Sequence, residues 1–324
     1  MKVFLLVLLC LSYLNLFSQK DTILPYREKV LFVYLNKIRS ATTDNDKKVA
    51  NGKFRDYLLE TILLPDAYTH PFTTLRTVGF ISSPDKKFKI INWNVQLEDE
   101  SNLFFCFLLR LGNRKKNKVI ELIEKSGYTE KLSKDVITEN NWYGALYYKI
   151  IPIEKGGKDL YTILGWRSNA NISNMKIIDV LQISGNHVKL GAPVFHTKTE
   201  KLKRVVYEYS KKATMSMRYE YKYDRIIFDH LSPEVPSMTG FYEYYIPDMS
   251  YDAFEFEKDK WILKEDVIGV NDPEKQTIKQ KTIDPLTGET IEVEVKKQWV
   301  DPTDADAPGG KNKHLPVLPK EKKR

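Results

Sequence analysis

The alternation of apolar and polar side chains is clearest between Val205 and Leu231. Its central part alternates apolar and charged or hydroxyl positions, with Met215, Met217, Tyr219, Tyr221 and Tyr223 on one side. A period of two is that of a strand with one buried and one solvated face. The flanking apolar runs Val205–Tyr209 and Arg225–Phe228 complete a pattern that predicts three strands folded back on one another. Because a few isolated strands bury too little surface to be stable in water, further strands must pack beside them.

Short apolar runs continue this β pattern on both sides of that region. The expected strands are Val78–Ser82, Phe88–Val95, Leu103–Leu111, Ala145–Pro152, Tyr161–Trp166, Lys176–Ile183, Val188–Phe195, Phe241–Ile246 and Ala253–Leu263. Glycine and Asx residues accept the backbone geometry of tight turns. The expected hairpin turns are therefore Asp85-Lys86, Gly156-Gly157, Gly185-Asn186 and Asp259-Lys260. Lys118–Glu124 is predicted as a short helix, with a strand as the alternative.

The residues before Leu75 show helical spacing instead. Apolar side chains recur at steps of three and four from Val30 to Ile38, and Pro25 suits the first turn of a helix. A second amphipathic pattern covers Phe54–Ile62 and stops before Pro65. These two segments predict an antiparallel helical pair packed against the sheet.

The combined pattern predicts a mainly β fold, built as an antiparallel sheet, barrel or sandwich, with an N-terminal helical pair. A β-propeller is the alternative. Ser83-Pro84-Asp85, before a strand that contains Trp93, resembles one stretch of a propeller blade. No such signature repeats at the interval that blades require, so the resemblance is confined to that stretch.

The first residues have the pattern of a secretory signal peptide. Met1-Lys2 precedes the apolar run Val3–Phe17, which is too short and too interrupted for a comfortable membrane span. Cleavage is expected after Ser18. Cys10 suggests lipidation as an alternative, but the apolar run continues past it as in an ordinary signal peptide. The mature chain is then expected to have no transmembrane segment.

The whole chain is expected to divide into four parts. These are a signal peptide (1–18), a helical segment (19–70), a β-rich domain (71–270) and a C-terminal part (271–324). In the last part, Thr277–Ile283 and Thr290–Val295 flank the turn sequence Asp284–Glu289 and predict a hairpin arm. The basic tail that follows has almost nothing to bury and is predicted to be disordered.

Composition narrows the class of protein. The 324 residues are 42% hydrophobic, enough for a sizeable core. The net charge is +8, but 43 acidic side chains are interspersed with the 51 basic ones. Because a nucleic-acid site needs a contiguous basic face, and because export is expected, no nucleic-acid partner is predicted. Without the signal peptide Cys106 is the only thiol, and its apolar surroundings predict a buried side chain.

The titratable residues carry no recognisable catalytic or metal-binding motif. His70, His187, His196 and His230 lack the spacing of zinc ligands, so no metal or other cofactor is expected. A calcium site near Asp248 and Asp252 is an alternative, because hard cations favour carboxylates in loops.

The candidate binding residues are aromatic. Trp142 and Tyr143 follow two asparagines, and Trp166 and Arg167 precede a serine and an asparagine. Ring faces beside amide groups suit sugars or peptides, because flat apolar area and fixed hydrogen bonds coexist there. The alternative is that Trp142 and Trp166 close the ends of the core.

The overall pattern resembles exported bacterial proteins of unknown function, a resemblance that implies no activity. We therefore expect an exported, non-enzymatic binding or structural protein, located in the periplasm, at the cell surface or outside the cell. Its expected partner is a protein or a carbohydrate of the cell envelope. The alternative is a secreted hydrolase that uses Asp229, His230, Asp248 and Asp252. A cleft that brings at least two of these side chains within hydrogen-bonding reach would favour it.

Overall fold

The computed structural model describes residues 23–112, 117–125, 133–169 and 172–269, and the backbone of two further strands at 277–283 and 290–296. Residue contacts divide the chain into one unit that ends at Ile268 and a second that begins at Gly269. The predicted signal peptide, with Cys10, and the predicted disordered tail lie outside the described residues.

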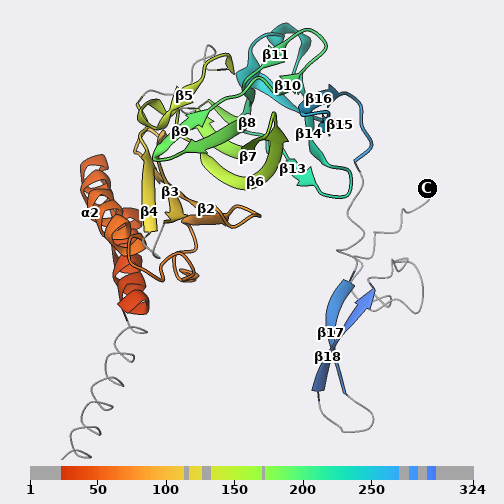
Figure 1. Cartoon of the computed structure of the whole chain (residues 1–324). Helices are drawn as coiled ribbons and strands as arrows, with labels where there is room; N and C mark the ends of the chain where they lie inside the picture. Colours follow the sequence, from red (N-terminus) through yellow and green to blue (C-terminus); the bar gives the residue numbers. More distant parts are fainter. Residues whose placement is uncertain are drawn as a thin grey trace, which may run out of the picture. The chain divides into compact units, whose positions relative to one another are not determined.

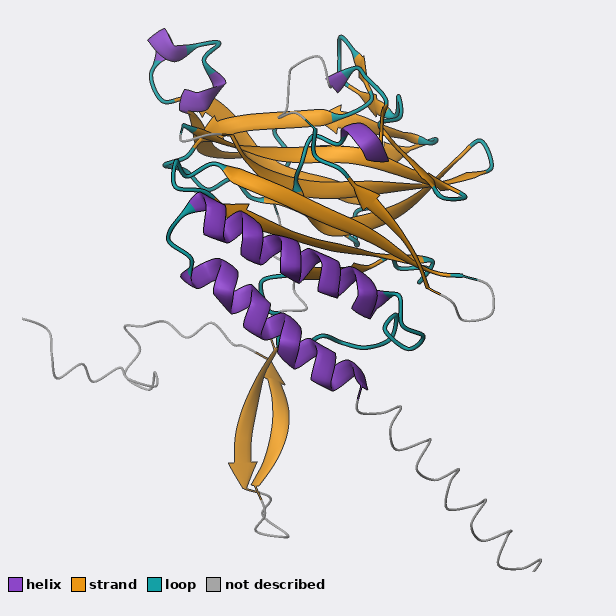
Figure 2. Cartoon of the chain, turned by 90° about the vertical axis from the view of Figure 1, so that its left-hand side faces the viewer, coloured by secondary structure: helices purple, strands orange, loops and turns teal. Residues whose placement is uncertain are grey.

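Two α-helices begin the described part of the first unit and run side by side along one sheet (Figure 2). One covers residues 23–40, and α2 covers Asp44–Ile62. The Thr43 hydroxyl accepts the Asp46 amide at 3.2 Å and so caps the first turn of α2. The predicted helical pair is confirmed. Among the described residues, no helix has both the length and the apolarity needed to cross a membrane.

The first sheet is antiparallel and has the strand order β1-β2-β3-β4. Its strands are β1 (Gly79–Ser82), β2 (Phe88–Gln96), β3 (Asn102–Leu111) and β4 (Asn117–Leu122). The prediction of a helix over Lys118–Glu124 was wrong, because this segment pairs with β3 and places Ile120 and Leu122 in the core. Pairing with a neighbouring strand outweighs a weak local helical preference.

The second sheet has the order β5-β9-β8-β7-β6. Its strands are β5 (Ile137–Thr138), β9 (His187–Leu190), β8 (Ser173–Ser184), β7 (Lys158–Asn169) and β6 (Leu146–Lys155). A further strand, β12 (Val205–Ser210), pairs with the first half of β8.

The third sheet has the order β11-β10-β16-β15-β14-β13 (Figure 1). Its strands are β11 (Lys201–Leu202), β10 (Phe195–His196), β16 (Lys260–Lys264), β15 (Tyr245–Glu257), β14 (Arg225–Pro233) and β13 (Met217–Glu220). The predicted single strand Val188–Phe195 is divided between β9 and β10. The break includes Gly191, whose φ of 103° favours glycine.

Neighbouring residues on one strand point into different cores. Ile91 faces the helices and Ile90 faces the second sheet, whereas Ile163 faces the first sheet and Leu164 the third. The helices and the three sheets therefore form successive layers with a core between each pair. This is the predicted sandwich-like architecture. None of the described sheets closes on itself, so neither the barrel nor the propeller is observed.

The segment Val205–Leu231 forms strands as predicted, but in two different sheets. β12 pairs with β8, whereas β13 pairs with β14. The prediction that all three strands fold back on one another was therefore wrong. The alternation also ends early: Tyr221 and Tyr223 are exposed, because a turn replaces the strand after Glu220. Cys106 is buried as predicted.

The second unit contains one described hairpin. β17 (Thr277–Ile283) pairs antiparallel with β18 (Thr290–Lys296), which confirms the predicted hairpin arm. The turn between these strands lies outside the described residues.

Candidate functional site

The connection between β14 and β15 lies outside the three cores. Its residues 234–244, here called the aromatic loop, form two short 3-10 helices, Pro236–Met238 and Tyr242–Tyr244. The sequence predicted a strand over Phe241–Ile246, but β15 begins only at Tyr245. That prediction was wrong for the first half of the segment.

Local hydrogen bonds give the aromatic loop a defined conformation. The Phe241 amide donates to the Met238 carbonyl at 3.0 Å, and the Tyr244 amide donates to the Phe241 carbonyl at 3.0 Å. The Thr239 hydroxyl donates to the Pro236 carbonyl at 2.8 Å. A loop held in this way loses less conformational entropy when it binds.

The aromatic side chains of this loop are directed to the surface. Phe241 is 55% exposed and Tyr242 is 56% exposed, and Tyr244 is also exposed. Met249, on β15 just beyond the loop, is 93% exposed. No residue of 234–244, all of which the structure describes, belongs to one of the three cores. Exposed aromatic and methionine side chains are enriched where proteins bind one another.

A surface hollow of about 350 Å³ lies beside the aromatic loop. We call it the β12 hollow, and its lining consists of Ile172, Ser210, Lys211, Lys212, Glu243 and Tyr244. The Lys211 ammonium is paired with Glu100. Within the described part of the chain neither Lys212 nor Glu243 has an ion pair, so the hollow offers one positive and one negative charge beside apolar surface.

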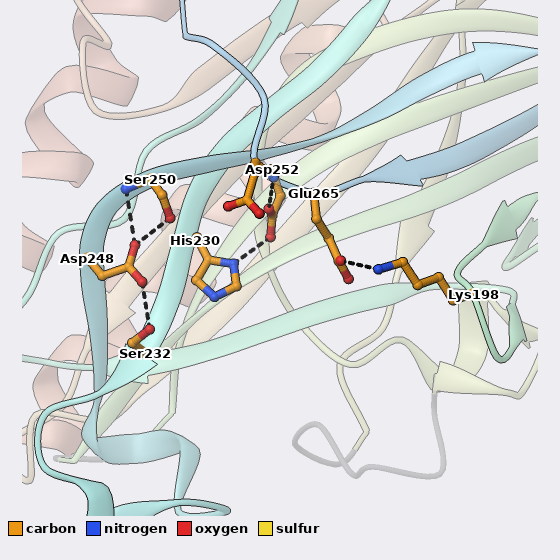
Figure 3. Close-up of polar contacts among 8 residues, drawn as sticks. Lys198, His230, Ser232, Asp248, Ser250, Asp252 and Glu265 are labelled. Carbon is orange, nitrogen blue, oxygen red and sulfur yellow. Dashed lines mark hydrogen bonds and ion pairs between the residues drawn. The ribbon is translucent and has the colours of Figure 1, made fainter.

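A cluster of polar side chains lies on β14 and β15, where these strands enter and leave the aromatic loop (Figure 3). Asp248 accepts the Ser232 hydroxyl at 2.6 Å and the Ser250 hydroxyl at 2.7 Å. The hydrogen bond from Ser232 is the main cause that lowers the pKa of Asp248 to about 2. Because Ser232 precedes the loop and Asp248 follows it, the hydrogen bond between these two residues joins the two ends of the loop.

The second part of this cluster is a histidine–aspartate pair. His230 Nδ1 lies 2.8 Å from Asp252 Oδ2, and Asp252 also accepts the Asp266 amide at 3.1 Å. The hydrogen bond to Asp252 raises the pKa of His230 above its ordinary value, although partial burial opposes it. Two of the four residues predicted for a hydrolase are thus within hydrogen-bonding reach.

Among the described residues, no serine hydroxyl is hydrogen-bonded to the His230 ring, as a hydrolase of the triad type needs. Asp229 accepts the Ser216 amide at 2.6 Å. Within the described part of the chain the one hydrogen bond of the His230 ring goes to Asp252, and both serine hydroxyls donate to Asp248. A nucleophile must be hydrogen-bonded to its base.

The described residues also include no group of three or more His, Cys, Asp or Glu side chains arranged to hold a metal ion. The calcium alternative near Asp248 and Asp252 thus has no such group to support it. The carboxylate of Asp248 accepts hydrogen bonds from two serines. The carboxylate of Asp252 is hydrogen-bonded to His230 and to a backbone amide.

Trp142 and Tyr143, predicted as ligand-contacting residues, are fully buried between the first and second sheets. The Trp142 indole donates to the Tyr147 hydroxyl at 2.8 Å, and the Tyr143 hydroxyl donates to Asp179 at 2.9 Å. Burial raises the pKa of Tyr143 well above its ordinary value. In this structure both rings therefore serve the core.

The other two predicted residues lie at the edge of the same core. Trp166 is half-buried, whereas Arg167 is buried and donates to Glu124 at 3.2 Å and to the Gly144 carbonyl at 3.0 Å. A ligand-contacting role of Trp142, Tyr143, Trp166 and Arg167 stays a prediction, and their burial gives it no support. The signal that reasoning from sequence missed is Pro233, Pro236 and Gly240 beside an aromatic run, a composition typical of an aromatic loop rather than a strand.

Comparison of the chain with protein-family models, with curated proteins and with solved structures found no match.

Proposed function

We propose that this chain is a non-enzymatic binding protein and that the aromatic loop, together with the β12 hollow, forms its binding surface. The observation that carries the proposal is the exposure of Phe241, Tyr242 and Tyr244 on a loop that its own hydrogen bonds hold in place. Covering such rings with a partner removes apolar surface from water at little cost in loop entropy.

The chemistry of this surface favours a protein as the partner. Aromatic and methionine side chains supply the apolar centre, and Glu243 and Lys212 supply charges at its border. This is the usual arrangement of a protein interface. Export to the periplasm, the cell surface or the medium belongs to the proposal, and it would place the partner in the cell envelope.

Photo-crosslinking tests the binding surface. A photoreactive phenylalanine analogue is incorporated at Tyr242 in the native cell. As a control it is incorporated at Tyr26, a tyrosine of the helix over 23–40 that is 66% exposed, against 56% for Tyr242. We expect a discrete protein adduct from position 242 and none from position 26. Adducts that a glycosidase removes would indicate a carbohydrate partner instead. Absence of any adduct specific to position 242 would contradict the proposed surface.

A double variant separates binding from folding. Phe241→Ser with Tyr242→Ser should abolish the adduct formed by an analogue placed at Met249. Because neither side chain belongs to a core, the free energy of unfolding should change by less than about 0.5 kcal/mol. Retention of the adduct in this variant would show that the rings are not part of the interface.

The hydrolase alternative is favoured by one observation, the hydrogen bond between His230 and Asp252. If it is correct, His230→Gln should reduce the hydrolysis of an activated ester by at least about 100-fold, because removal of a general base has effects of that size. Equal rates for the wild type and the variant would exclude this role of His230.

A further inference from the structure

The helix over 23–40 carries a second row of apolar side chains besides the one that enters the core. The core row includes Leu31 and Leu35, which are fully or almost fully buried. The second row recurs at steps of three and four, so its members lie in one line along another side of the helix. None of them belongs to one of the three cores. We call this row the outer stripe, and it consists of Ile23, Tyr26, Val30 and Val33.

The outer stripe is open to solvent. Tyr26 is 66% exposed, Val33 is 50% exposed and Ile23 is 46% exposed. Phe32, the residue before Val33, is 40% exposed. In the described part of the first unit, the two helices form an outer layer against the first sheet (Figure 2). Several exposed apolar side chains on one outer helix indicate a surface that contacts a partner or a membrane.

The charges beside the outer stripe are positive. Lys29 and Lys37 lie four residues before and after Val33, so both flank it on the same side of the helix. Both lysines are exposed, and within the described ranges neither has an ion pair. The one acidic residue of this helix, Glu28, is buried and hydrogen-bonded to His70 at 2.6 Å. The helix therefore offers cations and no carboxylate beside its exposed apolar row.

This combination matches the surface of a bilayer that contains anionic lipids. Aliphatic side chains enter the boundary between headgroups and acyl chains, and a tyrosine ring lies at the level of the headgroups. Lysine stems are long enough to bring the ammonium groups to the lipid phosphates. We propose that the outer stripe, with Lys29 and Lys37, holds this helix flat on an anionic membrane surface. The proposal uses no residue of the aromatic loop and is independent of the partner proposed for it.

A second copy of the chain fits the outer stripe less well. Two such stripes in contact would bring the Lys29 and Lys37 side chains of both copies together, and like charges repel. One row of four side chains is also small beside the about 800 Å² per partner that a stable protein interface buries. A lipid surface at Tyr26 gives no protein adduct, in agreement with the result expected for the crosslinking control.

Vesicle sedimentation tests the proposal. The chain purified from its native cell is mixed with vesicles of phosphatidylcholine, or of phosphatidylcholine with about 30% phosphatidylglycerol, an anionic lipid. We expect binding to the anionic vesicles to be at least about tenfold tighter, and to weaken at high salt. Equal binding to both kinds of vesicle, or no binding to the anionic ones, would overturn the proposal.

Charge-matched variants locate the contact. Lys29→Gln with Lys37→Gln should weaken binding to the anionic vesicles at least about tenfold. Lys158→Gln with Lys189→Gln removes the same charge from exposed positions on strands of the second sheet, and it should leave binding unchanged. If both pairs have equal effects, the attraction is general and the assignment to the outer stripe is wrong. Thermal unfolding of each variant shows whether the fold persists.

A fluorescent label provides a test that does not depend on those variants. A dye that shifts to the blue in an apolar environment is attached to Val33→Cys and, as the control, to Val235→Cys. The two valines are 50% and 45% exposed. Cys106, the only other thiol of the expected mature chain, is buried and does not compete for the label. Anionic vesicles should shift the emission at position 33 and not at position 235. A shift at 235 alone, or at neither position, would contradict the proposal.

Discussion

Trp261 donates its indole N–H to the hydroxyl of Thr162 at 2.8 Å, and both side chains are fully buried. Trp261 lies on β16 of the third sheet and Thr162 on β7 of the second. The bond thus joins two layers across the core of apolar side chains that they share. Removal of either side chain leaves the polar group of the other without this hydrogen bond.

A double-mutant cycle on this pair should reveal a favourable coupling. Trp261→Phe and Thr162→Val each remove one partner, and we expect an interaction free energy of about 1 kcal/mol between them. Urea unfolding of the wild type, both single variants and the double variant measures it. A coupling of zero would mean that the bond makes no net contribution to the stability of the sandwich.

Gly144 should not tolerate a side chain. Its φ is +78°, and an added Cβ would lie 2.4 Å from Glu124 Oε1. Gly144→Ala is therefore expected to destabilise the fold by about 3 kcal/mol, through backbone strain and displacement of Glu124. Gly156→Ala is the matched control, because φ is +59° there and nothing lies within 4 Å. It should cost only the strain, about 1 kcal/mol. Equal losses in urea unfolding would exclude the steric part.

Truncation of Trp142 should reduce stability rather than binding alone. The side chain is fully buried and hydrogen-bonded to Tyr147, so Trp142→Ala is expected to cost about 3–5 kcal/mol. The half-buried Trp166 should lose less in the same substitution. Chemical unfolding measures both. Near-wild-type stability of Trp142→Ala would instead restore this tryptophan as a candidate for ligand contact.

The His230–Asp252 pair should make stability depend on pH. Asp252 raises the pKa of His230 above its ordinary value of 6.5. The folded state therefore binds the proton more tightly than the unfolded state. The stabilisation is fully present below pH 6.5 and is lost as the pH rises through the raised pKa. Urea midpoints at pH 5.5 and pH 8.5 should differ more for the wild type than for His230→Gln. Because the His230 side chain is 41% exposed, the difference will be modest.

His196 gives this experiment an internal contrast. Burial, and then nearby lysines, lower the pKa of His196. The folded state therefore binds this proton less tightly than the unfolded state, and His196 lowers the stability of the fold as the pH falls, which is the opposite of the effect of His230. It is present in the wild type and in His230→Gln alike, and therefore cancels in their difference. An identical pH dependence of the two proteins would contradict the effect of the His230–Asp252 pair.

The sequence predicted a strand correctly where one pattern of apolar and polar residues continues along the whole strand. Leu103–Leu111 is almost continuously apolar, and β3 is indeed buried on both faces, with Phe107 toward the helices and Leu108 toward the second sheet. A continuous apolar run of this kind indicates a strand whose two faces are both covered, as in the middle layers of a layered fold.

The apolar patterns did not predict which strands pair with each other. β12 joins β8, which precedes it by more than twenty residues, although β13 is nearer in sequence. Pairing between distant strands depends on which apolar faces meet, and periodicity along one strand does not contain that information. The exposure of Phe241 and the burial of Trp142 have the same origin: both are aromatic residues near polar neighbours, and only tertiary packing separates them.

The position of the helical pair has a practical consequence for shortened versions of the protein. A chain that started after these helices would present Ile91, Trp93 and Phe107 to water on one side of the first sheet. Such a surface invites self-association and insolubility. Expression boundaries that trim the N-terminus should therefore be set before residue 23, even for work that concerns only the aromatic loop.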